Sequence, residues 1–341
     1  MSRPALASVL AALLLTGCAA QPPVLVAAEA PAVSPSAALA ELFRQSDEAD
    51  LARNPLRALS RGDLRYAHRL GDWPSDAYYE AERQAARSEL AALARIDRSA
   101  LSGDEQVAYD VFKWDRETSL KGLEGEVFLA SVVQPVDHFN GFHTEFAELS
   151  SGESIAPFKT LADYDNGLRR IDDFVRMTDG SIARMEQGLA AGIVQPKLVM
   201  ANVVEQLDAM LAEGVETSSF YRPLTKFPAA VPAAEQERLK AAYRQAILSE
   251  IRPALTRLRD FIRDRYMPRA RDSVGLLHMK GGPALYRYLV EVRTTTSLSP
   301  DEIHAIGLAE VARIHREMEA VKRQVGFTGS LKQFFEHIRT D

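Results

Sequence analysis

The chain has 341 residues, 46% of them hydrophobic, and a formal net charge of -6 at pH 7. This acidic balance argues against a nucleic-acid partner, because binding to a phosphate backbone relies on clustered Lys and Arg side chains. A chain of this length and apolar content can bury a sizeable core.

The first 17 residues have the layout of a bacterial secretion signal. Arg3 supplies a positive charge, and the apolar run that follows at residues 5–15 is shorter than the ~20 residues of a membrane-spanning helix. The run ends in Leu-Thr-Gly-Cys at residues 15–18, which resembles the bacterial lipobox. We therefore expect removal of residues 1–17 and attachment of lipid to Cys18. The alternative is a plain secretory signal with Cys18 as an ordinary thiol.

The residues around Cys18 predict where the protein resides. Cys18 is the only cysteine, so the chain has no internal disulfide. Ala19 follows it in place of the aspartate that retains lipoproteins in the inner membrane, which favours the outer membrane, facing the periplasm. Residues 18–36 are rich in Ala and Pro and are expected to be an extended tether.

Residues 37–341 are predicted to form one mainly α-helical domain, with a multi-helix, bundle-like body. Apolar residues recur at helical spacing, with Pro, Ser or Gly at the boundaries. The last helix has the clearest start, because Ser299 can cap it, Pro300 suits its first position and Glu302 completes a capping box. Helices are expected at residues 36–54, 75–96, 102–123, 160–189, 197–211, 232–266 and 299–325.

Two segments break the helical pattern and are expected to be non-helical. The first covers residues 127–151: its apolar run at residues 127–133 predicts a strand or buried extended segment, and the Asn-Gly pair at residues 140–141 predicts a turn. The second lies around residues 274–297. The domain is therefore predicted to contain one or two short extended or β segments.

The histidines offer only weak candidates for chemistry. His138 and His143 lie with Asp137 and Glu145 around the predicted turn, and they could bind a metal or act in catalysis; the alternative is a polar loop packed by phenylalanines. The sequence contains no His-Glu-x-x-His zinc motif, no Gly-x-Ser-x-Gly elbow and no phosphate-binding or dinucleotide fingerprint. No metal ligand is therefore assigned.

A glycine- and hydroxyl-rich region is the better candidate for a binding site. A double glycine leaves backbone groups open to another chain, although it also suits a tight turn. The threonines that follow could meet a substrate or cap a helix. The candidate groove residues are Gly281, Gly282, Tyr286, Tyr288, Thr295 and Thr296.

These same residues carry a family resemblance. Gly-Gly-Pro-Ala-Leu-Tyr-Arg-Tyr-Leu-Val at residues 281–290, Thr-Thr-Thr-Ser-Leu-Ser-Pro-Asp-Glu-Ile at residues 294–303 and Val-Gly-Phe at residues 325–327 resemble the bacterial domain-of-unknown-function family 885 (DUF885). The resemblance covers essentially all of the chain after the signal. It implies a lipoprotein whose helical fold is similar to the N-terminal part of thermostable-carboxypeptidase-type zinc metallopeptidases.

The resemblance also implies that this chain does not include the family's zinc-binding segment. The family's zinc-binding segment lies downstream of the part that matches residues 325–327, so this chain resembles only the N-terminal half of a member and is expected to be truncated. It then needs no cofactor, with zinc expected only in a full-length member. We expect the N-terminal part of a lipid-anchored, peptidase-like protein, inactive alone, with the 281–288 and 294–302 regions flanking a peptide groove. The alternative is a non-enzymatic envelope lipoprotein that binds a peptide or protein partner.

Overall fold

Helices account for the regular structure of residues 33–340, the part of the chain that this computed structural model describes. The expected signal peptide, Cys18 and nearly all of the tether lie outside these residues. The mainly α-helical class is confirmed. β-Pairing in the described residues amounts to one isolated parallel bridge between Pro196 and Arg271. No helix in this part of the chain has the length and apolar content needed to cross a membrane.

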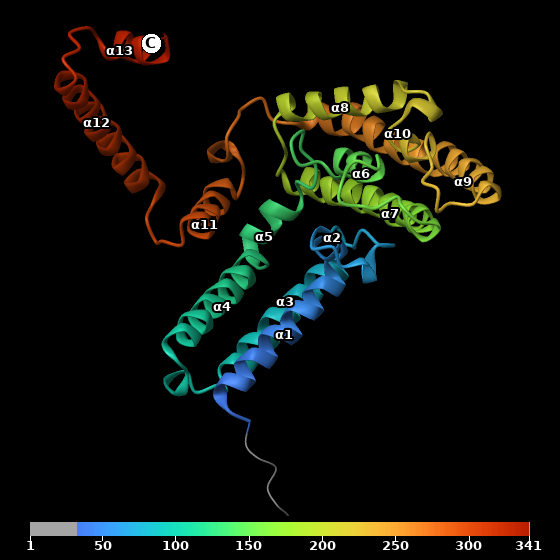
Figure 1. Ribbon diagram of the computed structural model, residues 1–341, viewed down its shortest axis with the longest axis horizontal. Helices are drawn as coiled ribbons and strands as arrows, with labels where there is room; N and C mark the ends of the chain where they lie inside the picture. Colours follow the sequence, from blue (N-terminus) through green and yellow to red (C-terminus); the bar gives the residue numbers. More distant parts are fainter. Residues whose placement is uncertain (1–32, 341) are drawn as a thin grey trace, which may run out of the picture. The chain divides into compact units, whose positions relative to one another are not determined.

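The first helices form an antiparallel group. α1 lies beside α3, and α3 beside α4 (Figure 1). Serine caps start two of them: the Ser75 side chain accepts from the Tyr78 N–H, and Ser102 and Glu105 form a capping box. A small apolar core that includes Leu39, Leu42 and Leu93 joins the group. The bounds are α1 (Pro35–Arg53), α2 (Pro55–Ser60), α3 (Asp76–Leu93) and α4 (Gly103–Gly122).

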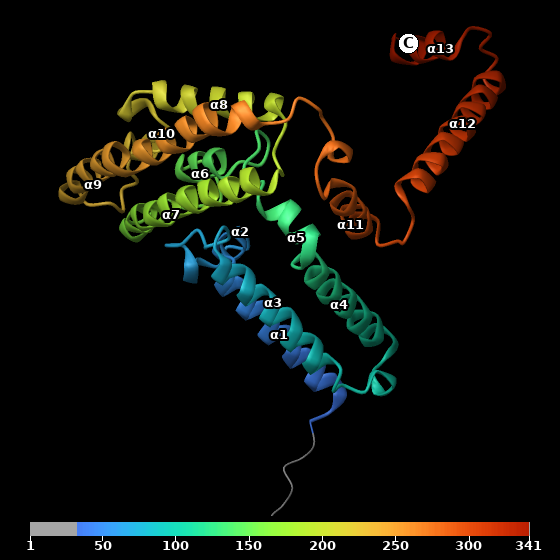
Figure 2. The same ribbon diagram turned by 180° about the vertical axis from the view of Figure 1, so that it is seen from behind.

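The next helices enclose the main hydrophobic core. Phe174 of α7, Met200 of α8 and Leu258 of α10 are fully buried within it. α10 packs against both α7 and α8 (Figure 2). The bounds are α6 (Phe142–Ser150), α7 (Leu161–Ala191), α8 (Lys197–Ala212), α9 (Ala233–Ala246) and α10 (Arg252–Asp260).

The predicted helix at residues 232–266 is continuous but contains two π-helical turns, Ile247–Ile251 and Phe261–Tyr266. A proline follows each turn, Pro253 in one case and Pro268 in the other. Proline has no N–H to donate, and its ring clashes with the carbonyl four residues earlier. Widening the helix before the proline relieves that clash, so the chain keeps its direction without breaking.

Both predicted non-helical segments contain helices, which corrects two of the sequence predictions. Residues 127–133, predicted as a strand, lie almost entirely in α5 (Gly125–Val132), and α6 occupies residues 142–150 of the same segment. The segment around 274–297 contains α11 (Gly282–Thr294). A short apolar run is compatible with either a buried strand or a buried helix, and its periodicity does not decide between them. α5 and α11 pack on each other around Val133, Met279 and Leu285.

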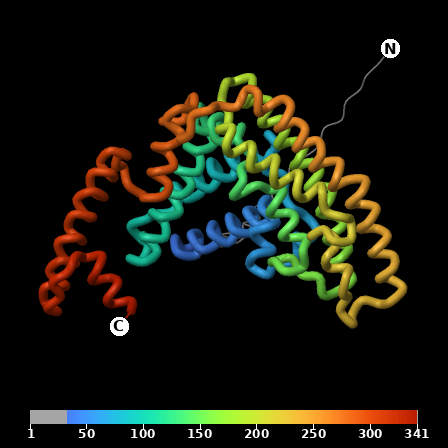
Figure 3. Tube along the Cα trace, turned by 90° about the horizontal axis from the view of Figure 1, so that it is seen from above, coloured from blue at the N-terminus to red at the C-terminus, as the bar shows by residue number. Residues whose placement is uncertain are grey.

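The chain ends in α12 (Pro300–Gln324) and α13 (Leu331–Thr340), which contact each other (Figure 3). The predicted start of α12 is confirmed, since Ser299 and Glu302 form the capping box and Pro300 takes the first position. Short 3-10 turns elsewhere are Leu64–Tyr66, Arg98–Ala100, Val215–Thr217, Arg222–Leu224, Met267–Arg269 and Leu276–His278.

Candidate functional site

A pocket of about 520 Å³ lies against α11, between the end of α4, the start of α5 and the loop that leads to α12. We call it the α11 pocket. Segments about 160 residues apart in the sequence form it, and its lining mixes apolar, charged and hydroxyl side chains. Its lining residues are Lys121, Val127, Ala284, Arg287, Tyr288, Glu291, Thr296, Ser297, Leu298 and Ser299.

Tyr288 is fixed against α4 by a close approach. Its hydroxyl donates to the Thr118 carbonyl at 3.3 Å, and Gly122 makes room for the ring, because a Cβ at that position would lie 2.0 Å from the Tyr288 hydroxyl oxygen. Burial raises the pKa of Tyr288, so the phenol stays protonated. Tyr288 therefore offers the pocket a rigid aromatic wall and a neutral hydroxyl.

The α11 pocket has one ion pair and one additional positive charge. Lys121 and Glu291 form an ion pair with each other across the pocket. Arg287 is exposed and has no ion-pair partner among residues 33–340. An anion that enters the pocket would therefore meet a guanidinium that is not already held in an ion pair.

The threonine run forms the turn that connects α11 to α12. Thr295 caps α11 with φ of 55°, a left-handed conformation that is strained for a β-branched residue. The hydroxyls of Thr294 and Thr296 lie 2.9 Å apart, and the Thr294 hydroxyl also donates to the Val290 carbonyl at 2.9 Å. Thr296 is thus brought into the pocket by a folded turn, while Thr295 lies outside the lining.

The N-terminus of α12 contributes little attraction for anions. The Ser299 N–H donates to the Glu302 carboxylate at 2.7 Å, and the Glu302 N–H donates to the Ser299 hydroxyl at 3.2 Å. The first turn also carries Asp301. Two carboxylates already complement the helix dipole there, so Arg287 remains the pocket's anion-attracting group.

The double glycine makes a turn and does not line the pocket. Gly281 has φ of 74°, and the Gly282 N–H donates to the Met279 carbonyl at 2.9 Å. A Cβ on Gly282 would lie 1.8 Å from the Leu276 carbonyl oxygen, so only glycine fits there. Tyr286 is exposed on α11 and also lies outside the lining. Of the six candidate groove residues, the structure brings Tyr288 and Thr296 together in the pocket.

His138 and His143 do not line the α11 pocket and lie near the start of α6. His143 is fully buried, with Nε2 at 3.2 Å from the Gln206 Oε1 atom. The Gln206 amide nitrogen donates to the His138 carbonyl at 2.9 Å, so its oxygen faces His143 and the His143 Nε2 atom carries the proton. Nδ1 is then a buried acceptor with no donor among the described residues. Burial lowers the pKa of His143, which favours a neutral, structural imidazole.

The described part of the chain contains no set of metal ligands. Within residues 33–340, no three side chains of His, Cys, Asp or Glu gather closely enough to hold one ion. The zinc that the resemblance implies for a full-length member therefore does not fit the residues described.

Comparison with known proteins identifies the family. Residues 55–341 match the family model described as "Bacterial protein of unknown function (DUF885)". The chain belongs to the DUF885 family. The family resemblance carried by the glycine and threonine motifs is thereby confirmed.

One solved structure similar to this DUF885 chain supports its fold. It is the crystal structure of the "putative lipoprotein" from Colwellia psychrerythraea, with a TM-score of 0.70 and 16% sequence identity. The match covers 91% of this chain and 55% of the other, so this chain spans about half the length of that protein. Curated protein sequences gave no match.

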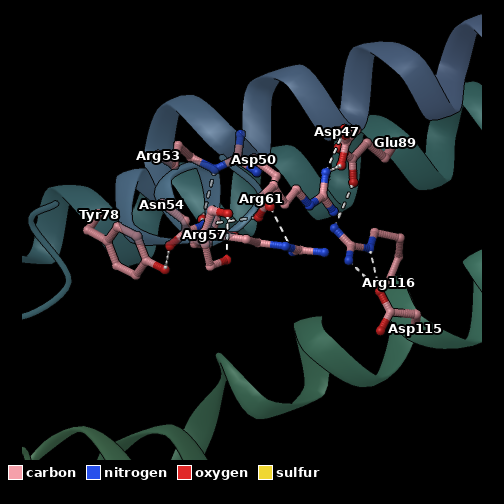
Figure 4. Close-up of polar contacts among 12 residues, drawn as sticks. Asp47, Asp50, Arg53, Asn54, Arg57, Arg61, Tyr78, Glu89, Asp115 and Arg116 are labelled. Carbon is pink, nitrogen blue, oxygen red and sulfur yellow. Dashed lines mark hydrogen bonds and ion pairs between the residues drawn. The ribbon is translucent and has the colours of Figure 1, made fainter. Parts of the chain in front are cut away.

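The sequence patterns of this DUF885 chain did not indicate a polar network between its first helices. Pairs along α1 and α2 include Asp47 with Arg61 and Asp50 with Arg57, each at 2.7 Å (Figure 4). A cleft of about 430 Å³ beside the network is lined partly by these groups. Each aspartate of this lining is paired with an arginine. An ion-pair cluster of this kind leaves no local motif, since its members come from different helices.

Two further parts of this network are more deeply buried. Arg116 of α4 pairs with Glu89 of α3 at 3.2 Å and also with its neighbour Asp115 (Figure 4). The Tyr78 hydroxyl donates to Asn54 at 2.9 Å, and burial raises the pKa of Tyr78, so this phenol is not available as a base. The network therefore joins α3 to α4 through Glu89 and Arg116, and α3 to the end of α1 through Tyr78 and Asn54, and we assign it a structural role.

Proposed function

We propose that this chain is the body of a bacterial envelope lipoprotein whose α11 pocket binds a peptide segment. The anchor is lipid on Cys18, and Ala19 favours the outer membrane, facing the periplasm. The signal and lipobox support this anchor, as does the fold similarity to the Colwellia psychrerythraea protein, which carries a lipoprotein description. The lipid supplies the contact with the membrane.

The unpaired Arg287 in the α11 pocket is the observation that carries peptide binding. A guanidinium binds a carboxylate through two parallel hydrogen bonds, which suits a peptide C-terminus or an acidic side chain. Val127, Ala284 and Leu298 line the same pocket and offer apolar contacts to a neighbouring side chain. The hydroxyls of Tyr288 and Thr296 can meet peptide amides and carbonyls.

Peptide hydrolysis is the parent activity that we infer for longer members of the family. The support is the resemblance to zinc metallopeptidases, together with a chain that spans about half of the similar structure. Residues 33–340 provide no set of three metal ligands, so we infer that this chain alone binds peptides without cleaving them. Peptide-cleaving activity that survives both chelation and repeated purification would contradict this inference.

The second candidate is a non-enzymatic lipoprotein that binds a peptide or protein partner in the envelope. The missing ligand set in the described residues favours it. Both candidates include peptide binding at Arg287, but only the peptidase requires bound zinc. Zinc analysis of a longer member of the family separates them, because stoichiometric zinc supports the peptidase and its absence supports the binding protein.

The binding step is tested with a fluorescent, N-blocked pentapeptide of alanine and phenylalanine that has a free C-terminal carboxylate. We expect Arg287→Gln to weaken its binding about fivefold or more, the effect of losing one charge-assisted contact. Arg293→Gln is the matched control, because Arg293 is exposed on the same helix but does not line the pocket. Equal affinities for the two variants would contradict the assignment.

The anchor is tested separately. An alkyne-labelled fatty acid fed to a Gram-negative host should label the wild-type chain, and Cys18→Ser should abolish labelling. Labelling that persists in the Cys18→Ser variant would contradict the assigned position of the lipid.

A further inference from the structure

A further cavity, which shares no lining residue with the α11 pocket, lies between α6 and α7. Its volume is about 230 Å³. Phe146 and Leu149 of α6 and Phe174 and Met177 of α7 form its walls, and all four side chains are buried. We call it the α6–α7 cavity.

The walls of the α6–α7 cavity are rigid and apolar. Phe146 and Phe174 stack with ring centroids 4.3 Å apart, and Phe142 packs on Phe174 at 5.8 Å. These rings belong to the main core, where close packing holds them in place. An apolar cavity of this kind holds water poorly, and one of ~150 Å³ is large enough for a benzene ring.

The rim of the α6–α7 cavity is acidic. Glu145 and Glu148 lie one turn of α6 apart, both exposed, and both line the cavity. Neither has an ion-pair partner among residues 33–340, whereas the exposed Asp179 and Glu186 of α7 are both paired with arginines. The lining contains no Lys, Arg or His. A cation at the rim would therefore gain from two carboxylates with no competing positive charge.

We propose that the α6–α7 cavity is a binding site for an apolar ammonium compound: one aromatic ring or branched alkyl group that carries a positively charged amine. The apolar group fills the cavity, where burial of its surface is favourable. The ammonium group stays at the rim, beside Glu145 and Glu148. Anionic ligands are disfavoured by the same carboxylates. This site is independent of the peptide-binding proposal for the α11 pocket.

The geometry also provides a signal for binding. Trp73 lies edge-on to Phe142, with ring centroids 6.2 Å apart, and Phe142 lines the cavity. The chain has two tryptophans, so Trp114→Phe leaves Trp73 as the single reporter. Titration of the whole chain in this background, followed by tryptophan fluorescence, reports on the cavity through the contact between Trp73 and Phe142.

Three probes separate the apolar and the charged contributions. 2-Phenylethylamine has both groups, its N-acetyl derivative has only the ring, and methylammonium has only the charge. We expect saturable binding of 2-phenylethylamine, about fivefold weaker binding of the N-acetyl derivative and no detectable binding of methylammonium. Raising the salt concentration should narrow the difference between the first two.

Charge variants complete the test. Glu145→Gln/Glu148→Gln should remove the preference for the amine and leave binding of the N-acetyl derivative unchanged. The matched control is Glu205→Gln/Glu213→Gln, which alters the net charge equally at two exposed glutamates on or beside α8 that do not line the cavity. The proposal is overturned if 2-phenylethylamine does not bind, if its N-acetyl derivative binds equally well, or if the control variant also loses the preference.

Discussion

At the scale of single residues, His143 shows how burial couples a side chain to pH. The imidazole is fully buried and donates to Gln206, and burial lowers its pKa below the usual value. The sequence placed His143 beside a predicted turn, but the partner is a glutamine 63 residues further on. Only the packing of α6 on α8 determines whether such a histidine is a ligand or a core residue.

His143 should make the protein less stable in mild acid. As pH falls below about 6.5, the unfolded chain binds a proton at His143 before the folded chain does, so the free energy of unfolding decreases. We expect His143→Gln, which keeps a donor for Gln206, to reduce this dependence by up to about 1.4 kcal/mol per pH unit. Urea unfolding between pH 5 and 8 measures the pH dependence of the free energy of unfolding.

The other histidines provide a check on this pH prediction. Burial also lowers the pKa of His68, with Arg169 and Arg69 adding to the effect, so His68 contributes to the slope in both proteins. His68→Gln combined with His143→Gln should flatten the dependence further. An unchanged slope in the His143→Gln variant would contradict the assigned cause.

Gly282 is expected to be intolerant of any side chain. A Cβ there would lie 1.8 Å from the Leu276 carbonyl oxygen, which belongs to the backbone and cannot rotate away. We expect Gly282→Ala to destabilise the protein by about 2 kcal/mol or more through local strain. Thermal unfolding measures the loss.

Gly307 is the matched control for this glycine. It lies inside α12, and a Cβ at this position would meet no atom within 4 Å, so Gly307→Ala should stabilise its helix by about 0.5–1 kcal/mol. Equal effects of the two alanine substitutions would show that the close contact at Gly282 is not the cause. The sequence had offered a turn or a binding edge for the double glycine, and this contact favours the turn.

At the scale of helices, the sequence correctly predicted the features that depend on neighbouring residues alone, such as helix starts. Ser75, Ser102 and Ser299 each cap the helix that they were expected to start, because a cap depends on residues within one turn. α5 was missed because its eight residues are too few to show helical periodicity. Its identity is determined by packing on α11, a segment about 150 residues away.

The ion pair between Arg116 and Glu89 should stabilise the packing of α4 on α3. The Glu89 side chain is only 10% exposed, so removal of Arg116 leaves a poorly hydrated carboxylate without its cation. We expect Arg116→Met to destabilise the protein by about 1–3 kcal/mol, and Glu89→Gln in the same chain to recover at least half of the loss. Urea unfolding measures both.

An exposed pair involving the same helix is the control for Arg116. Arg98 and Asp110 lie 2.7 Å apart, with their side chains 45% and 53% exposed. Solvent screens this pair, so Arg98→Met should change the stability by no more than about 0.5 kcal/mol. If both arginine variants lose the same stability, burial of Glu89 does not explain the effect.

At the scale of the whole molecule, the α11 pocket depends on contacts that sequence patterns do not show. Lys121 and Glu291 are 170 residues apart, yet they form an ion pair across the pocket. Tyr288 and Thr296 were foreseen from their own neighbourhood, whereas Lys121 and Val127 were not. Their contribution follows from the packing of α4, α5 and α11, which no local motif specifies.

The described helices differ strongly in how much tertiary packing supports them, and this should appear as a difference in local stability. α7 buries fourteen of its 31 residues, while in α12 Lys322 is the buried residue among 25. Val311 and Val321 of α12 are about half exposed. Because most helix stability in proteins comes from tertiary packing, α12 should open locally far more often than α7.

We expect the backbone amides of α12 to exchange with deuterium at least about 100-fold faster than those of α7, as measured by mass spectrometry at dilute protein concentration. Equal protection of the two helices at every concentration would contradict the prediction, because α12 would then be held by packing that its exposed side chains do not provide.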